Sequence, residues 1–116
     1  MKNIKVKVSS FTKEPYGRYQ KIDGTSSGEQ FRKEEIVKHL QNPEVETLTV
    51  ILDAVNMDYT SSFLSEAFGG LVTKDKISDS DLSKLIIEAD DPLDKSRSER
   101  YISSFKSKRA KKNIEF

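Results

Sequence analysis

Residues 47–52 read Thr-Leu-Thr-Val-Ile-Leu, a run of apolar and β-branched residues that ends at Asp53. Its near-continuous hydrophobicity predicts a central strand covered on both faces. In open α/β sheets, functional sites form at the carboxyl ends of the strands. The stretch from Asp53 through the start of the next helix is therefore the first place where a site is expected.

A helix is predicted to follow this strand. Its N-terminus is expected to be capped by Ser61 or Ser62. Gly69 and Gly70 lie inside this helix, where each glycine destabilises the helix by about 1 kcal/mol relative to alanine. They therefore either permit close packing or end the helix early. The apolar residues recur with the spacing of one helical face: Phe63, Leu64, Ala67, Phe68, Leu71 and Val72.

Upstream, apolar residues alternate with lysine over residues 4–8 and predict a strand with one solvated face. A short second strand is predicted over residues 18–22, and it would pair with this first strand. The pair Ser26 and Glu29 has the spacing of a capping box at a helix N-terminus. The predicted helix ends before Pro43, and its apolar face consists of Phe31, Ile36, Val37 and Leu40.

Downstream, residues 84–88 (Lys-Leu-Ile-Ile-Glu) predict another strand, and a final helix begins after Asp91-Pro92. The order is β-(β)-α-β-α-β-α. It predicts an α/β fold with a small mixed, mostly parallel sheet and about three helices. One domain is expected over residues 1–105, followed by a basic C-terminal tail over residues 106–116.

Composition narrows the class of protein. The chain has 116 residues, 34% of them hydrophobic and 34% charged, which favours one domain with a small core. With 20 basic and 19 acidic side chains the net charge is +1, so no global field attracts nucleic acid or a membrane. The absence of cysteine excludes disulfides and thiolate metal sites. His39 is the single histidine, and we expect no metal and no cofactor.

The expected location is cytoplasmic. No uncharged run exceeds seven residues, whereas a membrane-spanning helix needs about 18. The N-terminus lacks the apolar region of a secretory signal.

A Gly- and Ser-rich turn that opens a helix, residues 16–29, is the first candidate site. Unpaired amides and the positive end of the helix dipole can hold a phosphate or carboxylate there. Arg18 or Arg32 would supply a bidentate contact. An ordinary loop with a good N-cap is the alternative. The residues of this candidate surface are Arg18, Tyr19, Asp23, Gly24, Ser27, Gly28, Glu29 and Arg32.

The second candidate is the run Thr60-Ser61-Ser62 at the next helix start. A phosphate on one of these hydroxyls would lie against the helix dipole and add about −1.5 to −2 charges to a surface that a partner reads. A plain capping role is the alternative. Hydrolysis is not expected, because His39 lies mid-helix with no reason to meet these serines.

Two further features are more typical of a solvated surface than of a binding or catalytic site. The basic run 106–112 could touch phosphate backbones, but the balanced net charge favours a solvated helix end. General acid–base catalysis needs two carboxylates in unlike environments. The sequence gives no sign of such a difference for the neighbouring acids Asp53/Asp58, Glu34/Glu35 and Asp90/Asp91.

Four blocks of the sequence carry a family resemblance: Gly17-Arg18-Tyr19, Asp23-Gly24, Ser27-Gly28-Glu29-x-Phe31-Arg32 and Ser61-Ser62-Phe63-Leu64-x-Glu66-Ala67-Phe68-Gly69-Gly70-Leu71. With these blocks the chain resembles, from Ile4 to Phe105, the STAS-like family of small prokaryotic domains, which has no firmly assigned activity. The broader STAS group contains anti-sigma-factor antagonists. They are non-enzymatic, bind a kinase-like ATPase and are switched by phosphorylation of a serine between a central strand and a helix.

The resemblance implies a STAS-like fold, no catalytic residues, and a protein partner of the histidine-kinase-type ATPase or regulator class. It adds Asp58 and Glu66 to the partner surface. STAS antagonists carry Asp-Ser followed by Ser/Thr-Gly, whereas residues 60–63 here read Thr-Ser-Ser-Phe. The implied phosphoacceptor is Ser61, Ser62 or Thr60.

The expected function is thus a non-enzymatic STAS-like module for protein interaction and signalling. One alternative is a small sensor of anions or nucleotides that uses the loop from Arg18 to Glu29, although no P-loop or Rossmann motif is present. A second alternative is a nucleic-acid-associated protein that binds through the basic tail.

Overall fold

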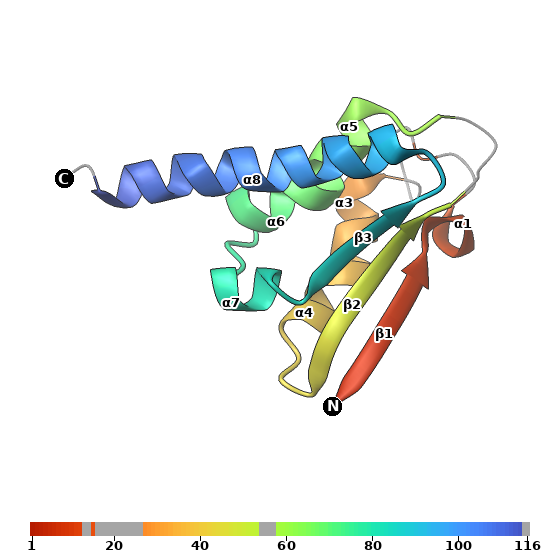
Figure 1. The fold of residues 1–116 in the computed structure, drawn as a ribbon, viewed down its shortest axis with the longest axis horizontal. Coiled ribbons are helices and arrows are strands. Elements are labelled where there is room, and N and C mark those ends of the chain that lie inside the picture. The colour runs from red at the N-terminus through yellow and green to blue at the C-terminus, as the bar shows by residue number, and fades with distance from the viewer. Residues whose placement is uncertain (13–14, 16–26, 54–57, 115–116) are drawn as a thin grey trace.

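Three strands form one parallel sheet, as the alternation of apolar runs and helical stripes predicts. The structure is a computed structural model that describes residues 1–12, 15, 27–53 and 58–114, with main chain only for 111–114. The strands are β1 (Lys2–Lys7), β2 (Val45–Leu52) and β3 (Leu85–Ala89), in the order β1-β2-β3 (Figure 1). The predicted α/β class is confirmed. The proposed strand over residues 18–22 lies outside the described residues.

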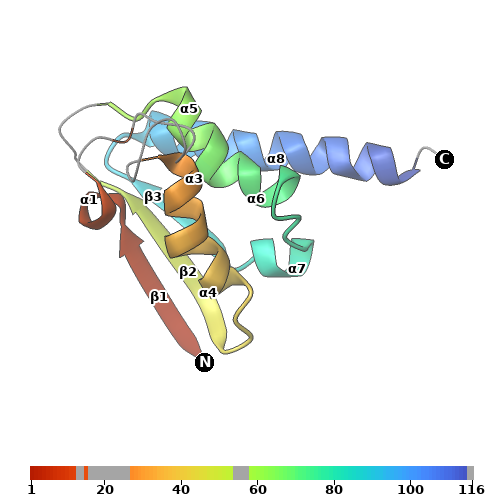
Figure 2. The same ribbon diagram turned by 180° about the vertical axis from the view of Figure 1, so that it is seen from behind.

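Three long helical segments accompany the sheet (Figure 2). The first joins α3 (Gly28–Phe31), the π-helix η2 (Arg32–Val37) and α4 (Lys38–Leu40). The second joins α5 (Ser61–Leu64), the π-helix η3 (Ser65–Gly69) and α6 (Gly70–Thr73), and the third is α8 (Pro92–Ile114). Two short helices, α1 (Val8–Phe11) and α7 (Asp79–Leu82), were not predicted. Strand β1 therefore ends before Val8.

The sheet buries one face. Ile4 and Val6 of β1 point toward the helices, while Lys5 and Lys7 are exposed. In β2, Thr47 and Ile51 on the lysine side remain partly exposed, although Thr49 between them is buried. The prediction that residues 47–52 are covered on both faces is therefore wrong for the described part of the chain. The described helices pack against the side of Leu48, Val50 and Leu52.

Three glycines allow the helices to approach one another closely. A Cβ atom on Gly28 would collide with the main-chain oxygen of Phe63 in α5. One on Gly69 would lie 2.5 Å from the ring of Phe105 in α8. One on Gly70 would collide with the guanidinium of Arg32. The helix continues to Thr73, so of the two alternatives for Gly69 and Gly70, close packing is the one observed.

Two helix caps differ from those predicted, each by one residue. Ser27, not Ser26, precedes the first long helix, and its hydroxyl accepts from the Gln30 amide at 3.1 Å. Thr60, not Ser61 or Ser62, caps the second and accepts from the Phe63 amide at 3.1 Å. Both caps have extended backbone, which lets the side-chain oxygen reach the amide three residues later.

Helix α8 runs without a break from Pro92 to Ile114, across the expected boundary at Phe105. Its basic end is tied back to the domain. Arg109 donates to the Ile77 carbonyl at 2.8 Å and to the Asp79 carboxylate at 2.6 Å. Lys106 lies 3.8 Å from the same carboxylate. The start of the predicted tail is therefore part of the folded domain.

We expect Gly28→Ala to destabilise the protein by about 1–3 kcal/mol, although alanine is the better helix former. The reason is that the new methyl group meets main-chain atoms of α5, which cannot rotate away. The free energy of unfolding in urea measures the effect. Ser104→Ala on the exposed side of α8 is the control and should change stability by less than about 0.5 kcal/mol. Equal stability of wild type and Gly28→Ala would contradict the packing argument.

Candidate functional site

Asp53 follows the central strand and organises the carboxyl edge of the sheet. The Ser9 amide donates to its carboxylate at 3.0 Å, and the Ser9 hydroxyl donates to the other oxygen. Burial raises the pKa of Asp53, but these hydrogen bonds outweigh burial and hold the pKa below its ordinary value. Asp53 thus holds α1 against the end of β2 as an ionised carboxylate.

Tyr59 connects this edge to the start of the second long helix. Its side chain is buried, and its hydroxyl donates to the Asp53 main-chain oxygen at 2.9 Å. Burial, together with the nearby Asp53 and Asp94 carboxylates, raises the pKa of Tyr59 well above its ordinary value. The phenol therefore stays protonated and acts as a fixed hydrogen-bond donor.

Three hydroxyl residues begin the second helix in different environments. Thr60 is occupied as the cap. Ser61 is exposed, and Ser62 is half-buried. Arg97 of α8 reaches this turn: its Nη1 donates to the Ser61 hydroxyl at 3.3 Å and its Nη2 to the Tyr59 carbonyl at 2.8 Å. A hydroxyl, a guanidinium and a helix N-terminus therefore meet at one exposed point.

The acids near this turn do not form a catalytic pair. Asp58 is exposed, and the Asp53 carboxylate is committed to Ser9. Asp94 pairs with Arg97 at 2.8 Å, and Asp91 accepts from the Leu93 amide at 2.9 Å. Among the described residues, no group of three or more His, Cys, Asp and Glu side chains could hold a metal ion.

Arg32 and Glu66, both predicted for the exposed surface, form a buried ion pair. Arg32 Nη1 donates to the Glu66 carboxylate at 2.9 Å and to the Glu66 main-chain oxygen at 2.7 Å. Their side chains are only 1% and 5% exposed. Lys74 donates to the same carboxylate at 2.7 Å. Arg32 Nε lies 2.6 Å from Asp75 Oδ2 without hydrogen-bond alignment, so that contact is electrostatic.

This ion pair lies where the two long helices touch within their π segments. Arg32 is the first residue of η2, and Glu66 is the second residue of η3. Burial raises the pKa of Glu66, but hydrogen bonds from Lys74 and Arg32 outweigh it and keep the pKa below its ordinary value. The pair is thus a charged contact between helices and offers no free guanidinium to an anion.

The described half of the candidate surface in residues 16–29 is not exposed as expected. Ser27, Gly28 and Arg32 are buried, because the helix that they begin packs directly on α5 and η3. Glu29 is half-buried and lies 3.8 Å from Lys33. The remaining members, Arg18, Tyr19, Asp23 and Gly24, lie outside the described residues.

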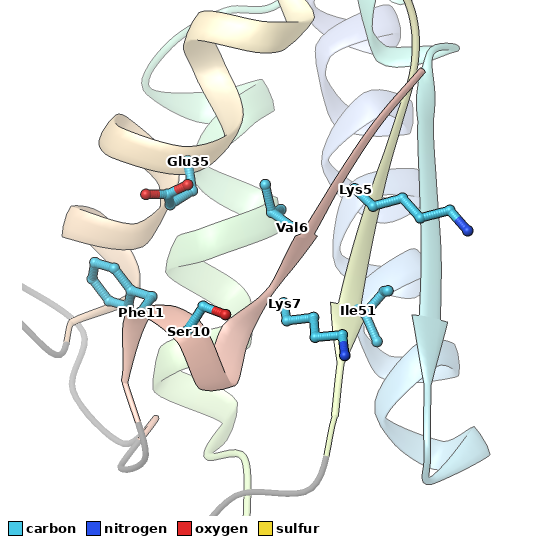
Figure 3. A pocket seen from close by; sticks show the side chains of 7 residues that line it. All are labelled: Lys5, Val6, Lys7, Ser10, Phe11, Glu35 and Ile51. Carbon is cyan, nitrogen blue, oxygen red and sulfur yellow. The ribbon is translucent and has the colours of Figure 1, made fainter.

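A shallow groove of about 380 Å³ lies along β1, at the edge that pairs with no other described strand (Figure 3). Lys5 and Lys7 extend on one side of the strand, and Val6 points to the other, toward Phe11 and Glu35 (Figure 3). The groove combines exposed cations with a few apolar contacts. Its lining offers no set of catalytic side chains.

The comparisons with known proteins add no relative. No family model matches the chain, and neither the search of curated proteins nor that of solved structures finds a match. In the described residues, no helix is both long and apolar enough to span a membrane.

We expect Glu66→Ala to cost about 3–5 kcal/mol, because it leaves the buried Arg32 guanidinium without its carboxylate partner. Urea unfolding measures the loss. Glu46→Ala is the control: Glu46 is an exposed residue of β2, so its removal should change stability by less than about 0.5 kcal/mol. A small effect at both positions would show that the buried pair does not hold the helices together.

Stability should fall as the pH drops below about 4.5, the ordinary pKa of a glutamate. The lowered folded-state pKa values of Glu66 and Asp53 mean that the unfolded chain takes up protons first. The stabilisation by these two carboxylates is complete above their pKa values in the unfolded chain. It is lost as the pH falls through their lower pKa values in the folded protein. Unfolding midpoints between neutral pH and about pH 3 measure this. Glu66→Gln should flatten the profile; an unchanged slope would contradict it.

Proposed function

We propose that the protein is a non-enzymatic, STAS-like interaction module that docks a signalling protein of the histidine-kinase-type ATPase or regulator class. The docking surface is formed by residues 58–62 and Arg97, at the carboxyl edge of the sheet. The observation that carries the proposal is the exposed Ser61 hydroxyl, which accepts from Arg97 at a helix N-terminus. The resemblance of this segment to STAS-like domains supports the same docking surface.

Ser61 is the preferred phosphoacceptor of the three candidates. The Thr60 hydroxyl accepts the Phe63 amide, so its modification would disturb the helix cap. Ser62 is half-buried, which restricts the approach of a kinase. Ser61 is exposed, and its hydroxyl accepts from Arg97, a cation that a phosphate can pair with.

A phosphate on Ser61 would make this surface strongly negative. It adds about −1.5 to −2 charges next to Asp58 and Asp94. Arg97 and the helix dipole would stabilise the modified form within the protein. A partner that contacts the unmodified turn would instead meet a strong negative charge, so phosphorylation acts as a release signal.

Partner capture from a lysate of the native host tests the proposal, together with mass spectrometry of phosphate on Ser61. The wild type and Ser61→Ala should capture an ATPase or regulator, whereas Ser61→Glu should lower the affinity for it about tenfold, or about 1.4 kcal/mol. Ser104→Glu, an exposed change elsewhere on the chain, should leave capture unchanged. The proposal fails if no regulator or ATPase is captured, or if both glutamate variants bind equally.

A further inference from the structure

The two outer edges of the sheet differ in how they resist contact with other strands. Within the described chain, β1 and β3 each pair with β2 alone. Strand β1 carries exposed Lys2, Lys5 and Lys7. Lysines on an edge strand discourage pairing with another chain. Strand β3 reads Leu-Ile-Ile-Glu-Ala and has neither lysine nor proline, so its edge lacks this protection.

Exposed apolar surface lies beside this unprotected edge. Ile86 of β3 is 43% exposed, which is unusual for a large apolar side chain among the described residues. A groove of about 360 Å³ runs between β3 and α8. It is lined by Leu82, Leu85, Ile86, Ile87 and Ile102, and by Lys95 and Glu99.

The two charges on the α8 wall of the groove are opposite and stand four residues apart. Neither Lys95 nor Glu99 forms an ion pair with another described residue. A lysine followed by a glutamate is the less favourable order for pairing within one helix. Both charges are therefore available to a partner that presents the reverse order.

We infer that the chain forms a two-fold symmetric dimer through the edge of β3 and the facing side of α8. A two-fold axis presents the same patch twice, and it reverses the direction of each element that runs perpendicular to it. Strand β3 then pairs antiparallel with its copy, which joins the two three-stranded sheets. The same reversal places Lys95 of one copy opposite Glu99 of the other, and this contact occurs twice.

The apolar groove supplies the remaining complementarity. Ile86 and Ile102 become covered at the centre of the contact, with the charged residues at its rim, as is usual at protein interfaces. A second copy fits this patch because the patch is complementary to itself in charge. The surface at residues 58–62 takes no part, since Arg97 turns toward Ser61 and does not line the groove.

Light scattering after gel filtration of the full chain tests the inference. The wild type should have the mass of a dimer. Lys95→Glu and Glu99→Lys each place like charges across the axis, so each variant alone should dimerise at least tenfold more weakly. An equimolar mixture of the two should form a heterodimer, because one copy then carries two acids and the other two lysines. Pull-down of an untagged variant by its tagged complement detects it.

Arg100→Glu is the matched control: Arg100 is exposed on α8 but does not line the groove, so this variant should remain dimeric. Circular dichroism should show unchanged helix content in every variant. The inference is overturned if the wild type is monomeric up to millimolar concentration, if both single variants remain dimers, or if their mixture does not associate. Because residues 58–62 are unchanged throughout, these outcomes are separate from those that test partner docking.

Discussion

The buried guanidinium of Arg32 holds the two helices that position the rest of the molecule. It lies between the carboxylates of Glu66 and Asp75, and Lys74 contacts the same Glu66 oxygen. Charges taken out of water are costly unless each is paired. The contact therefore permits few relative positions of the two helices, and removing one partner costs more than the pair contributes.

Small residues make this arrangement possible. Gly70 leaves the space that the guanidinium fills, and Gly28 lets α3 lie against the main chain of α5. With any larger side chain at these positions, the helices would separate and expose the buried charges. The apolar core and the ion pair thus depend on the same close approach.

The placement of the second helix determines what the sheet edge presents. Thr60 begins this helix beside the end of β2, and Tyr59 and Arg97 anchor the turn to Asp53 and α8. The result is an anchored turn whose Ser61 hydroxyl is exposed. The proposed docking surface and the proposed dimer contact use different sides of α8, so one copy can engage a partner and a second copy together.

The sequence by itself determined the order of the three described strands and the long helices, the α/β class and the position of the Thr-Ser-Ser turn, because period-2 and helical patterns are local properties of the chain. It could not determine which polar residues are buried. Arg32 and Glu66 look like surface charges in sequence, and only the crossing of two helices 34 residues apart brings them together. Arg97 likewise gives no local signal, since it meets Tyr59 across 38 residues. Such contacts depend on how helices pack, and tertiary structure alone decides that.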